Sequence, residues 1–135
     1  MIVIDASVAL AWCLADEADE IAERVLDRVA GEGAAAPSHW PLEVANGLLS
    51  AERRGRLDTA ATDRARELLA DLAIEIVPVE LSTATGSVLD LARRHDLSAY
   101  DAVYLALAWF RGLPLATLDN SLRRAARAED VELAD

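Results

Sequence analysis

The chain alternates short runs of apolar residues with longer stretches in which apolar residues recur every three or four positions. The short runs predict strands, since a strand covered on both faces is continuously apolar, and they fall at residues 2–4, 34–37, 74–79, 113–118 and 131–133. The longer stretches predict helices at residues 8–15, 19–28, 42–54, 59–72, 82–94, 97–111 and 121–128. This alternation indicates a three-layer α/β/α fold whose central parallel sheet has four to five strands.

Length and composition predict a single domain over residues 1–135. The chain has 135 residues, of which 53% are hydrophobic, enough to fill one core. Its longest apolar stretches are too short to cross a bilayer, and no signal-peptide pattern opens the sequence. We therefore expect a cytoplasmic protein. The single cysteine, Cys13, lies in an apolar run, where we interpret it as a core residue and not as a nucleophile.

The charge balance excludes a protein that holds nucleic acid by a general positive field. The chain has 24 acidic against 13 basic residues, for a net charge of −11. All the basic residues are arginine, so no mechanism can depend on a lysine, and no glycine-rich phosphate loop is present. A polyanionic substrate would therefore need local assistance at its binding site.

Two of the predicted strands end in a carboxylate that stands just before a helix. Asp5 follows the first strand and Asp119 the fourth. The carboxyl ends of parallel strands share one edge of the sheet, where ligands bind in open α/β folds. Helix capping is the alternative, because Asp5 or Ser7 could cap the first helix. Asn120 and Ser121 could cap the helix after Asp119, which leaves Asp119 freer for another role.

Two further acids stand at predicted helix starts. Asp101 belongs to a helix that is apolar all round and therefore predicted to be buried on all sides, where a lone charge is costly. A capping box with Ser98 is the alternative reading. Glu43 lies in the first turn of its helix, on one face with Asn46, where the helix dipole favours a negative charge in any case. The opposite, apolar side of that helix is predicted to comprise Leu42, Ala45, Leu48 and Leu49.

Strand carboxyl ends and helix amino ends meet on one rim of a parallel α/β sheet, so the four acids can converge. Two carboxylates about 4 Å apart repel by roughly 4 kcal/mol at an effective dielectric near 20, so such a cluster needs protons or cations. No arginine is adjacent to them in the sequence. A hard divalent cation such as Mg²⁺ or Mn²⁺ suits an all-oxygen site better than zinc does. In this conjunction Asp5 becomes a metal-ligand candidate, and Ser7 the better candidate for the cap.

Four stretches of the chain are typical of one known family: Ile2 to Ser7, Pro41 to Asn46, Leu97 to Ala106 and Pro114 to Asp119. They resemble the motifs of PIN-domain ribonucleases and, among these, of the VapC-type toxins of bacterial toxin-antitoxin pairs. The resemblance covers nearly the whole chain and implies a metal-binding catalytic cluster of Asp5, Glu43, Asp101 and Asp119. It also implies supporting polar groups at Ser7, Asn46, Thr117 and Asn120.

The resemblance further implies a metal-dependent endoribonuclease, in which a water activated by Mg²⁺ or Mn²⁺ hydrolyses an RNA phosphodiester. It implies a cognate antitoxin protein that blocks the cleft, a homodimer, and larger complexes with the antitoxin. Local arginines either steer the RNA or are solvated helix ends: Arg53, Arg54, Arg56, Arg93 and Arg94. The tryptophans are interface or, by default, core residues: Trp12, Trp40 and Trp109.

Other classes also fit parts of this pattern. A phosphatase of another α/β class would carry Asp-x-Asp where this chain has Asp5-Ala6-Ser7. A non-catalytic binding module could use the same acids to grip the arginines of a partner. A metal-free ribonuclease could use His39 and His95 for acid-base catalysis, although both occupy loop-like positions typical of surface residues.

Overall fold

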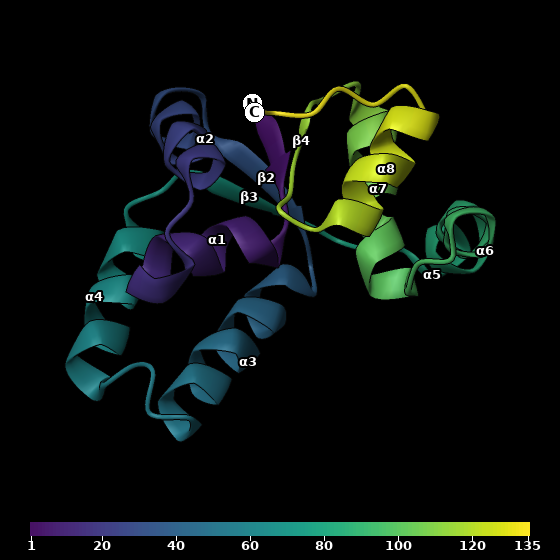
Figure 1. Ribbon diagram of the computed structural model, residues 1–135. Coiled ribbons are helices and arrows are strands. Elements are labelled where there is room, and N and C mark those ends of the chain that lie inside the picture. The colour runs from purple at the N-terminus through teal and green to yellow at the C-terminus, as the bar shows by residue number, and fades with distance from the viewer.

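The computed structural model describes residues 1–135 and has a four-stranded parallel sheet at its centre (Figure 1). The sheet runs in the order β3-β2-β1-β4, and Ile4 of β1 lies beside Ala116 of β4. The strands are β1 (Ile2–Ile4), β2 (Ala34–Pro37), β3 (Ile74–Val77) and β4 (Leu115–Ala116). The predicted parallel sheet is confirmed.

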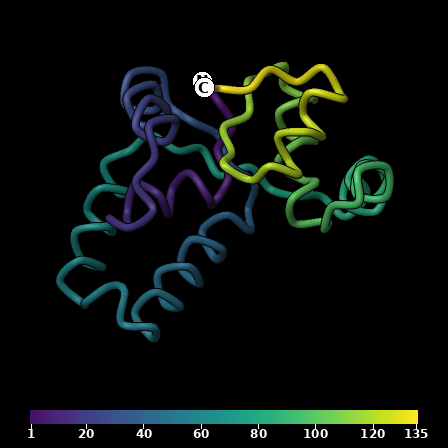
Figure 2. Tube along the Cα trace, viewed as in Figure 1, coloured from purple at the N-terminus to yellow at the C-terminus, as the bar shows by residue number.

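The helices form two layers that follow the order of the chain. Helices α1 to α4 lie on one side of the sheet and α5 to α8 on the other, as the purple-to-teal and green-to-yellow halves of the trace show in Figure 2. The helices are α1 (Ala6–Cys13), α2 (Glu20–Glu32), α3 (Trp40–Arg53), α4 (Thr59–Ala70), α5 (Leu81–Thr83), α6 (Leu89–His95), α7 (Ala99–Arg111) and α8 (Asn120–Ala128). The predicted α/β/α layering is therefore confirmed.

One apolar core joins the sheet to both layers of helices. Helix α1 packs against α2, α3 and α4, and α7 packs on β1, β2 and β4. Strand β2 has three consecutive alanines that are fully buried. Alanine is a poor strand former, but a position between β1 and β3 and under α7 overrides that preference. None of the helices is long and apolar enough to span a membrane.

The last predicted strand, 131–133, is only a single bridge. Leu115 pairs with Leu133 in parallel, through Leu115 N–H to the Glu132 carbonyl (2.8 Å) and Ala134 N–H to the Leu115 carbonyl (2.9 Å). Strand β4 itself is shorter than predicted. Pro114 has no N–H to donate to a ladder, and side-chain oxygens take the amides of Leu118 and Asp119.

The helix predicted at 82–94 is interrupted. A π-helical turn over Ala84–Val88 separates α5 from α6. The Thr85 hydroxyl donates to the Leu81 carbonyl (2.8 Å), a back-bond that bends helices, and Gly86 adds a poor helix former. The helix predicted at 82–94 is therefore confirmed in its extent, and the π turn within it was not predicted.

Helix α7 is not buried on all sides, contrary to the prediction. Its middle is buried, but Tyr100 at one end and Trp109 and Phe110 at the other are exposed. The neighbours of α7 on this side, α8 and the π turn, pack on its central turns and leave its two ends uncovered. Of the other tryptophans, Trp40 is buried, and Trp12 is half-buried with its indole N–H donating to the Ala22 carbonyl (2.7 Å).

The buried face of α3 also differs from the prediction. Leu48 is buried as expected, but Leu42, Ala45 and Leu49 face outward. The buried positions are Trp40, Val44, Leu48 and Ala51. Helix α1 packs on α3 and approaches it closely at Gly47, the residue next to the buried Leu48.

Helices α1 and α3 touch at Gly47, and we expect a side chain there to be costly. A Cβ at Gly47 would lie 2.5 Å from Leu10 Cδ1 and 2.6 Å from Cδ2. Relative to Gly31→Ala, which gains the same helix propensity of about 1 kcal/mol, Gly47→Ala should lower the free energy of unfolding by about 1–3 kcal/mol, measured by urea denaturation. Gly31→Ala is the matched control, since its Cβ meets nothing within 4 Å, and it should be neutral or slightly stabilising. Additive losses in the double variant Leu10→Ala/Gly47→Ala would contradict the clash.

Candidate functional site

Four helices begin at the carboxyl edge of the sheet, and each carries one of the predicted acids at its start. Asp5 is the N-cap residue of α1 and Asp119 that of α8. Glu43 lies in the first turn of α3 and Asp101 in the first turn of α7. Helix amino ends favour negative charge, so the fold itself places four carboxylates on one rim.

Asp5 is buried, with 5% of its surface exposed, and its carboxylate accepts three hydrogen bonds. Oδ1 accepts from the Ser7 hydroxyl (2.6 Å) and from the Val8 amide (3.1 Å). Oδ2 accepts from the Thr117 hydroxyl. The prediction that Ser7 caps α1 was wrong, because the bond to the Val8 amide makes Asp5 the cap. Since a carboxylate offers about four acceptor positions, Asp5 caps α1 and still has one acceptor position free.

Ser7 and Thr117 join the two neighbouring strand ends through Asp5. The Ser7 hydroxyl also accepts from the Leu118 amide (2.9 Å), and the Thr117 hydroxyl accepts from the Asp119 amide (3.0 Å). Continuing the register in which Ile4 pairs with Ala116, the residue beside Asp5 is Thr117, and Asp119 lies two residues further along the chain. These bonds hold Asp5 rigidly in place.

Asp119 is exposed, and its Oδ1 accepts from the Leu122 amide (2.8 Å). It therefore caps α8, and the prediction that the next two residues would do so was wrong. Ser98 caps α7, with its hydroxyl accepting from the Asp101 amide (3.1 Å). This bond is one half of the predicted capping box.

The charges of the four acids act on one another through Asp101. Burial is the main cause of the raised pKa of Asp101, and the charge of Asp119 raises it further. Burial likewise dominates the raised pKa of Asp5, to about 6, and that of Glu43, and in both cases the charge of Asp101 adds to the rise. Asp101 is thus the member that interacts with each of the other three.

His39 and Tyr104, which were not predicted as site residues, lie beside Glu43. The ring of His39 packs between those of Tyr100 and Tyr104, and its Nε2 lies 2.9 Å from the Tyr100 carbonyl oxygen and 2.7 Å from Glu43 Oε1. Because a carbonyl can only accept, Nε2 donates to it. Glu43 Oε1 is then left buried without an aligned hydrogen-bond partner, as is the Tyr104 hydroxyl. The signal for His39 was its position, one helical turn before Glu43.

The donors at this rim are suited in kind to a hard divalent cation. All four are carboxylates, and Glu43 Oε1 is a buried acceptor that receives no aligned hydrogen bond. As the side chains lie, however, no group of three or more acidic, histidine or cysteine side chains is close enough to hold a metal ion. Binding therefore requires the less constrained carboxylates to turn toward the fixed Asp5.

Other residues singled out from the sequence lie outside this cluster. Asn46 and Asn120 are exposed and make no side-chain hydrogen bond, so the structure does not join them to the acids. Burial raises the pKa of the Cys13 thiol to about 11, which keeps it protonated. His95 is not a surface residue, because it is largely buried against Glu129, 2.6 Å from Oε1.

The arginines near the predicted helix ends divide into two groups. Arg56 forms ion pairs with Asp16 and Glu17, and Arg94 pairs with Glu129. The remaining members make no ion pair and are exposed: Arg53, Arg54 and Arg93. None of the arginines pairs with any of the four acids, so the carboxylates have no internal positive counter-charge.

Stability should depend on pH through Asp5. Its pKa of about 6 lies above the ordinary value of 3.8, so the native state binds this proton more tightly than the unfolded chain. This contribution is full below about pH 4 and is lost as the pH rises through about 6. In chelator, the wild type should therefore gain about 2 kcal/mol relative to Asp5→Asn between about pH 7.5 and about pH 4.5. Urea denaturation at each pH measures this, and parallel curves for the two proteins would contradict it.

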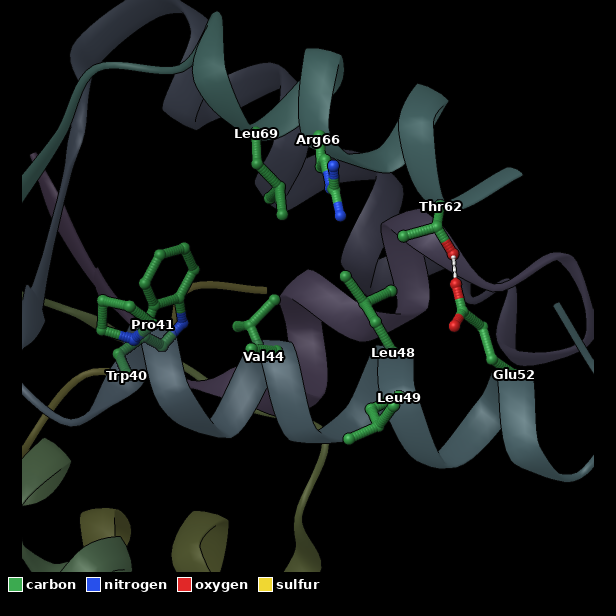
Figure 3. Close-up of a pocket in the computed structure, with 10 residues that line it drawn as sticks. Trp40, Pro41, Val44, Leu48, Leu49, Glu52, Thr62, Arg66 and Leu69 are labelled. Carbon is green, nitrogen blue, oxygen red and sulfur yellow. Dashed lines mark hydrogen bonds between the residues drawn. The ribbon is translucent and has the colours of Figure 1, made fainter. Parts of the chain in front are cut away.

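A separate apolar groove lies between α3 and α4 (Figure 3). Its volume is about 360 Å³. Trp40, Val44 and Leu48 project from α3 toward Leu69 of α4, and Thr62 donates a hydrogen bond to Glu52 at one end. None of the four acids lines this groove, so it is a surface distinct from the rim.

Comparison with known proteins gives the family to which this fold belongs. The PIN domain matches residues 2–128, and the chain belongs to the PIN-domain family. Within that family, VapC ribonuclease Mb0985 of Mycobacterium bovis is 35% identical over 130 residues, covering 96% of this chain and 94% of the relative. Ribonuclease VapC3 of Mycobacterium tuberculosis is 35% identical over 124 residues, covering 92% and 86%. The family resemblance inferred from the four stretches is confirmed.

Solved structures agree with this placement. PAE2754 from Pyrobaculum aerophilum superposes with a TM-score of 0.67 and 27% identity, covering 92% of this chain and 84% of that one. A chain of a toxin-antitoxin complex from Klebsiella pneumoniae superposes with a TM-score of 0.59 at 16% identity, covering 88% and 87%, a likeness of fold alone.

Proposed function

We propose that this protein is a Mg²⁺- or Mn²⁺-dependent endoribonuclease and the toxin of a toxin-antitoxin pair. The observation that carries the proposal is the cluster of four carboxylates at one rim: Asp5, Glu43, Asp101 and Asp119. Burial raises the pKa of the first three, and the charge of Asp119 raises the pKa of Asp101 further. No arginine pairs with any of the four carboxylates and His39 alone lies against one of them, so a divalent cation is the natural counter-charge for the rest. The ribonuclease names of relatives 35% identical over nearly the whole chain support the RNA substrate.

The four acids have different parts in this site. Asp5 is the fixed ligand, because its three hydrogen bonds leave one acceptor position and little freedom to move. Asp101 and Glu43 complete the inner set, and Asp119, exposed at the start of α8, faces incoming solvent and substrate. When bound, a divalent cation supplies an activated water and neutralises charge that develops on the phosphate oxygens.

The polar neighbours act by positioning. Ser7 and Thr117 orient the Asp5 carboxylate and tie it to the start of α8. His39 borders Glu43 and limits the positions its carboxylate can take. Ser98 fixes the start of α7 and therefore the position of Asp101. Asn46 and Asn120, which stand free at the surface, are proposed to support the site only once substrate is bound.

We further propose a cytoplasmic protein that pairs with a basic antitoxin. A net charge of −11 and an uncompensated acidic rim favour a partner that brings arginine or lysine to the carboxylates. The groove between α3 and α4 offers an apolar surface on the helix that carries Glu43. Homodimerisation is proposed through the exposed edge-to-face pair of Trp109 and Phe110, whose ring centroids are 5.3 Å apart.

Sequencing of RNA ends after expression of the protein alone tests the proposed function. Wild-type protein should generate new RNA ends at defined positions, and Asp101→Asn should not. Purified protein should cut the same positions in the presence of Mg²⁺ or Mn²⁺ and stop in excess chelator. Identical RNA ends from wild type and variant would overturn the proposal, as would cleavage that persists in chelator.

A further inference from the structure

Tyr100 is an exposed aromatic residue at the acidic rim. It immediately precedes Asp101 in the first turn of α7, and 69% of its surface is exposed. Of the exposed aromatic side chains, Tyr100 is the one at the acidic rim, whereas Trp109 and Phe110 lie together at the other end of α7. The cost of leaving this ring in water calls for an explanation other than packing.

The ring of Tyr100 ends a row of three rings that runs from the core to the surface. Tyr104 is buried, His39 is half-buried and Tyr100 is exposed. Ring centroids are 5.0 Å apart for His39 and Tyr104 and 5.8 Å apart for His39 and Tyr100. The hydrogen bond from His39 to the Tyr100 carbonyl fixes the middle ring against α7. The outermost ring is therefore in tilted contact with His39 on one side, at an interplanar angle of 47°, and most of its surface is exposed to solvent.

Charge explains why such a ring is useful at this place. The rim carries four carboxylates without an arginine paired to any of them, so it repels the phosphates of a nucleic acid. Stacking of a base on an aromatic ring does not depend on positive charge. A ring beside the carboxylates can therefore hold a nucleotide where a basic patch is missing.

We propose that Tyr100 is a base-stacking site, on which a nucleobase of single-stranded RNA lies while its neighbouring phosphate reaches the acids. The inference rests on the proposed ribonuclease function and adds how the substrate is held. The ligand is an unpaired base, because a base inside a duplex has no free face. Trp109 and Phe110 are not equivalent, since they lie roughly 14 Å further along the axis of α7 and pack against each other.

Steady-state cleavage of a single-stranded oligoribonucleotide that spans a mapped cut site tests the proposal. Tyr100→Ala should raise KM by about 5- to 140-fold, the range expected for one stacked base, and leave kcat unchanged. Tyr100→Phe should retain the wild-type KM, whereas Tyr100→Leu should not, which separates stacking from apolar contact. Leu81→Ala, at an apolar residue 78% exposed on α5, is the matched control and should leave KM unaltered.

Oligoribonucleotides with one abasic nucleotide at a time identify the stacked base. In wild type, one abasic position beside the cut should raise KM, and in Tyr100→Ala the same change should have no further effect. A wild-type KM in folded Tyr100→Ala would overturn the stacking site. So would additive effects on KM of the abasic nucleotide and the Tyr100→Ala substitution. Either result would overturn it whether or not Tyr100→Ala still binds the antitoxin. If wild-type protein cuts no RNA, the proposed function itself fails, and the two failures are thus distinguishable.

Discussion

The Asp101→Asn variant is expected to lose at least about a hundredfold in RNA cleavage, because one carboxylate ligand contributes several kcal/mol to the stabilisation of the transition state. Its melting temperature in chelator should be at least that of the wild type. Burial and the charge of Asp119 raise the pKa of Asp101, so the ionised carboxylate lowers the stability of the folded protein. Single-turnover cleavage and thermal melts measure the two effects.

Asp101 is a cleaner test than Asp5. The Asp5 carboxylate accepts three hydrogen bonds, so an asparagine there must turn an NH₂ group toward one of the donors and disturb the fold as well as the site. Asp90→Asn, an exposed acid on α6, is the matched control for loss of one charge and should cleave normally. Normal cleavage by purified Asp101→Asn would remove Asp101 from the site.

Divalent metal is expected to stabilise the protein strongly. At a free Mg²⁺ or Mn²⁺ concentration about 100 times Kd, mass action adds about 2.7 kcal/mol to the free energy of unfolding, and the melting temperature should rise by roughly 10 °C. The rise should largely disappear in Asp101→Asn and in Glu43→Gln. Thermal melts over a metal titration, against protein in chelator, provide the measurement.

A salt control is essential for this prediction. A chain with a net charge of −11 repels itself, so any added salt stabilises it to some degree by screening. Sodium chloride of equal ionic strength should produce a much smaller rise than the divalent ion, and the same small rise in wild type and in both variants. A rise that depended on ionic strength alone would count against a bound metal.

The layers of the fold could be predicted from the sequence because they depend on periodicity, which is local. The failures arise where a distant contact decides. The strand predicted at 34–37 did form, although alanine favours strands weakly, because two other strands enclose it. Strand β4 is shorter than predicted because Ser7 takes an amide that a longer strand would have used. The exposed ends of α7 likewise depend on which turns its neighbours cover, information that no hydrophobic pattern within the helix contains.

The candidate site was predictable in its residue types and their places in the chain, but not in its hydrogen bonds. Carboxylates at strand and helix ends can be identified in a sequence, whereas the choice between Asp5 and Ser7 as cap depends on side-chain rotamers. Thr117 was expected only as a supporting group, yet it is the residue beside Asp5 in the sheet. His39 was considered as an acid-base catalyst, and its packing between two tyrosines became visible only in three dimensions.

The bond between Thr117 and Asp5 also bears on when the site can exist during synthesis. It links positions 112 residues apart, and the bond from Leu118 to Ser7 links positions 111 apart. A ribosome releases the start of the chain long before the end, and domains fold as units once their partners have emerged. The hydrogen bonds that hold Asp5 in place therefore cannot form until nearly the whole polypeptide has left the ribosome. The Asp5 carboxylate is therefore ordered late in co-translational folding.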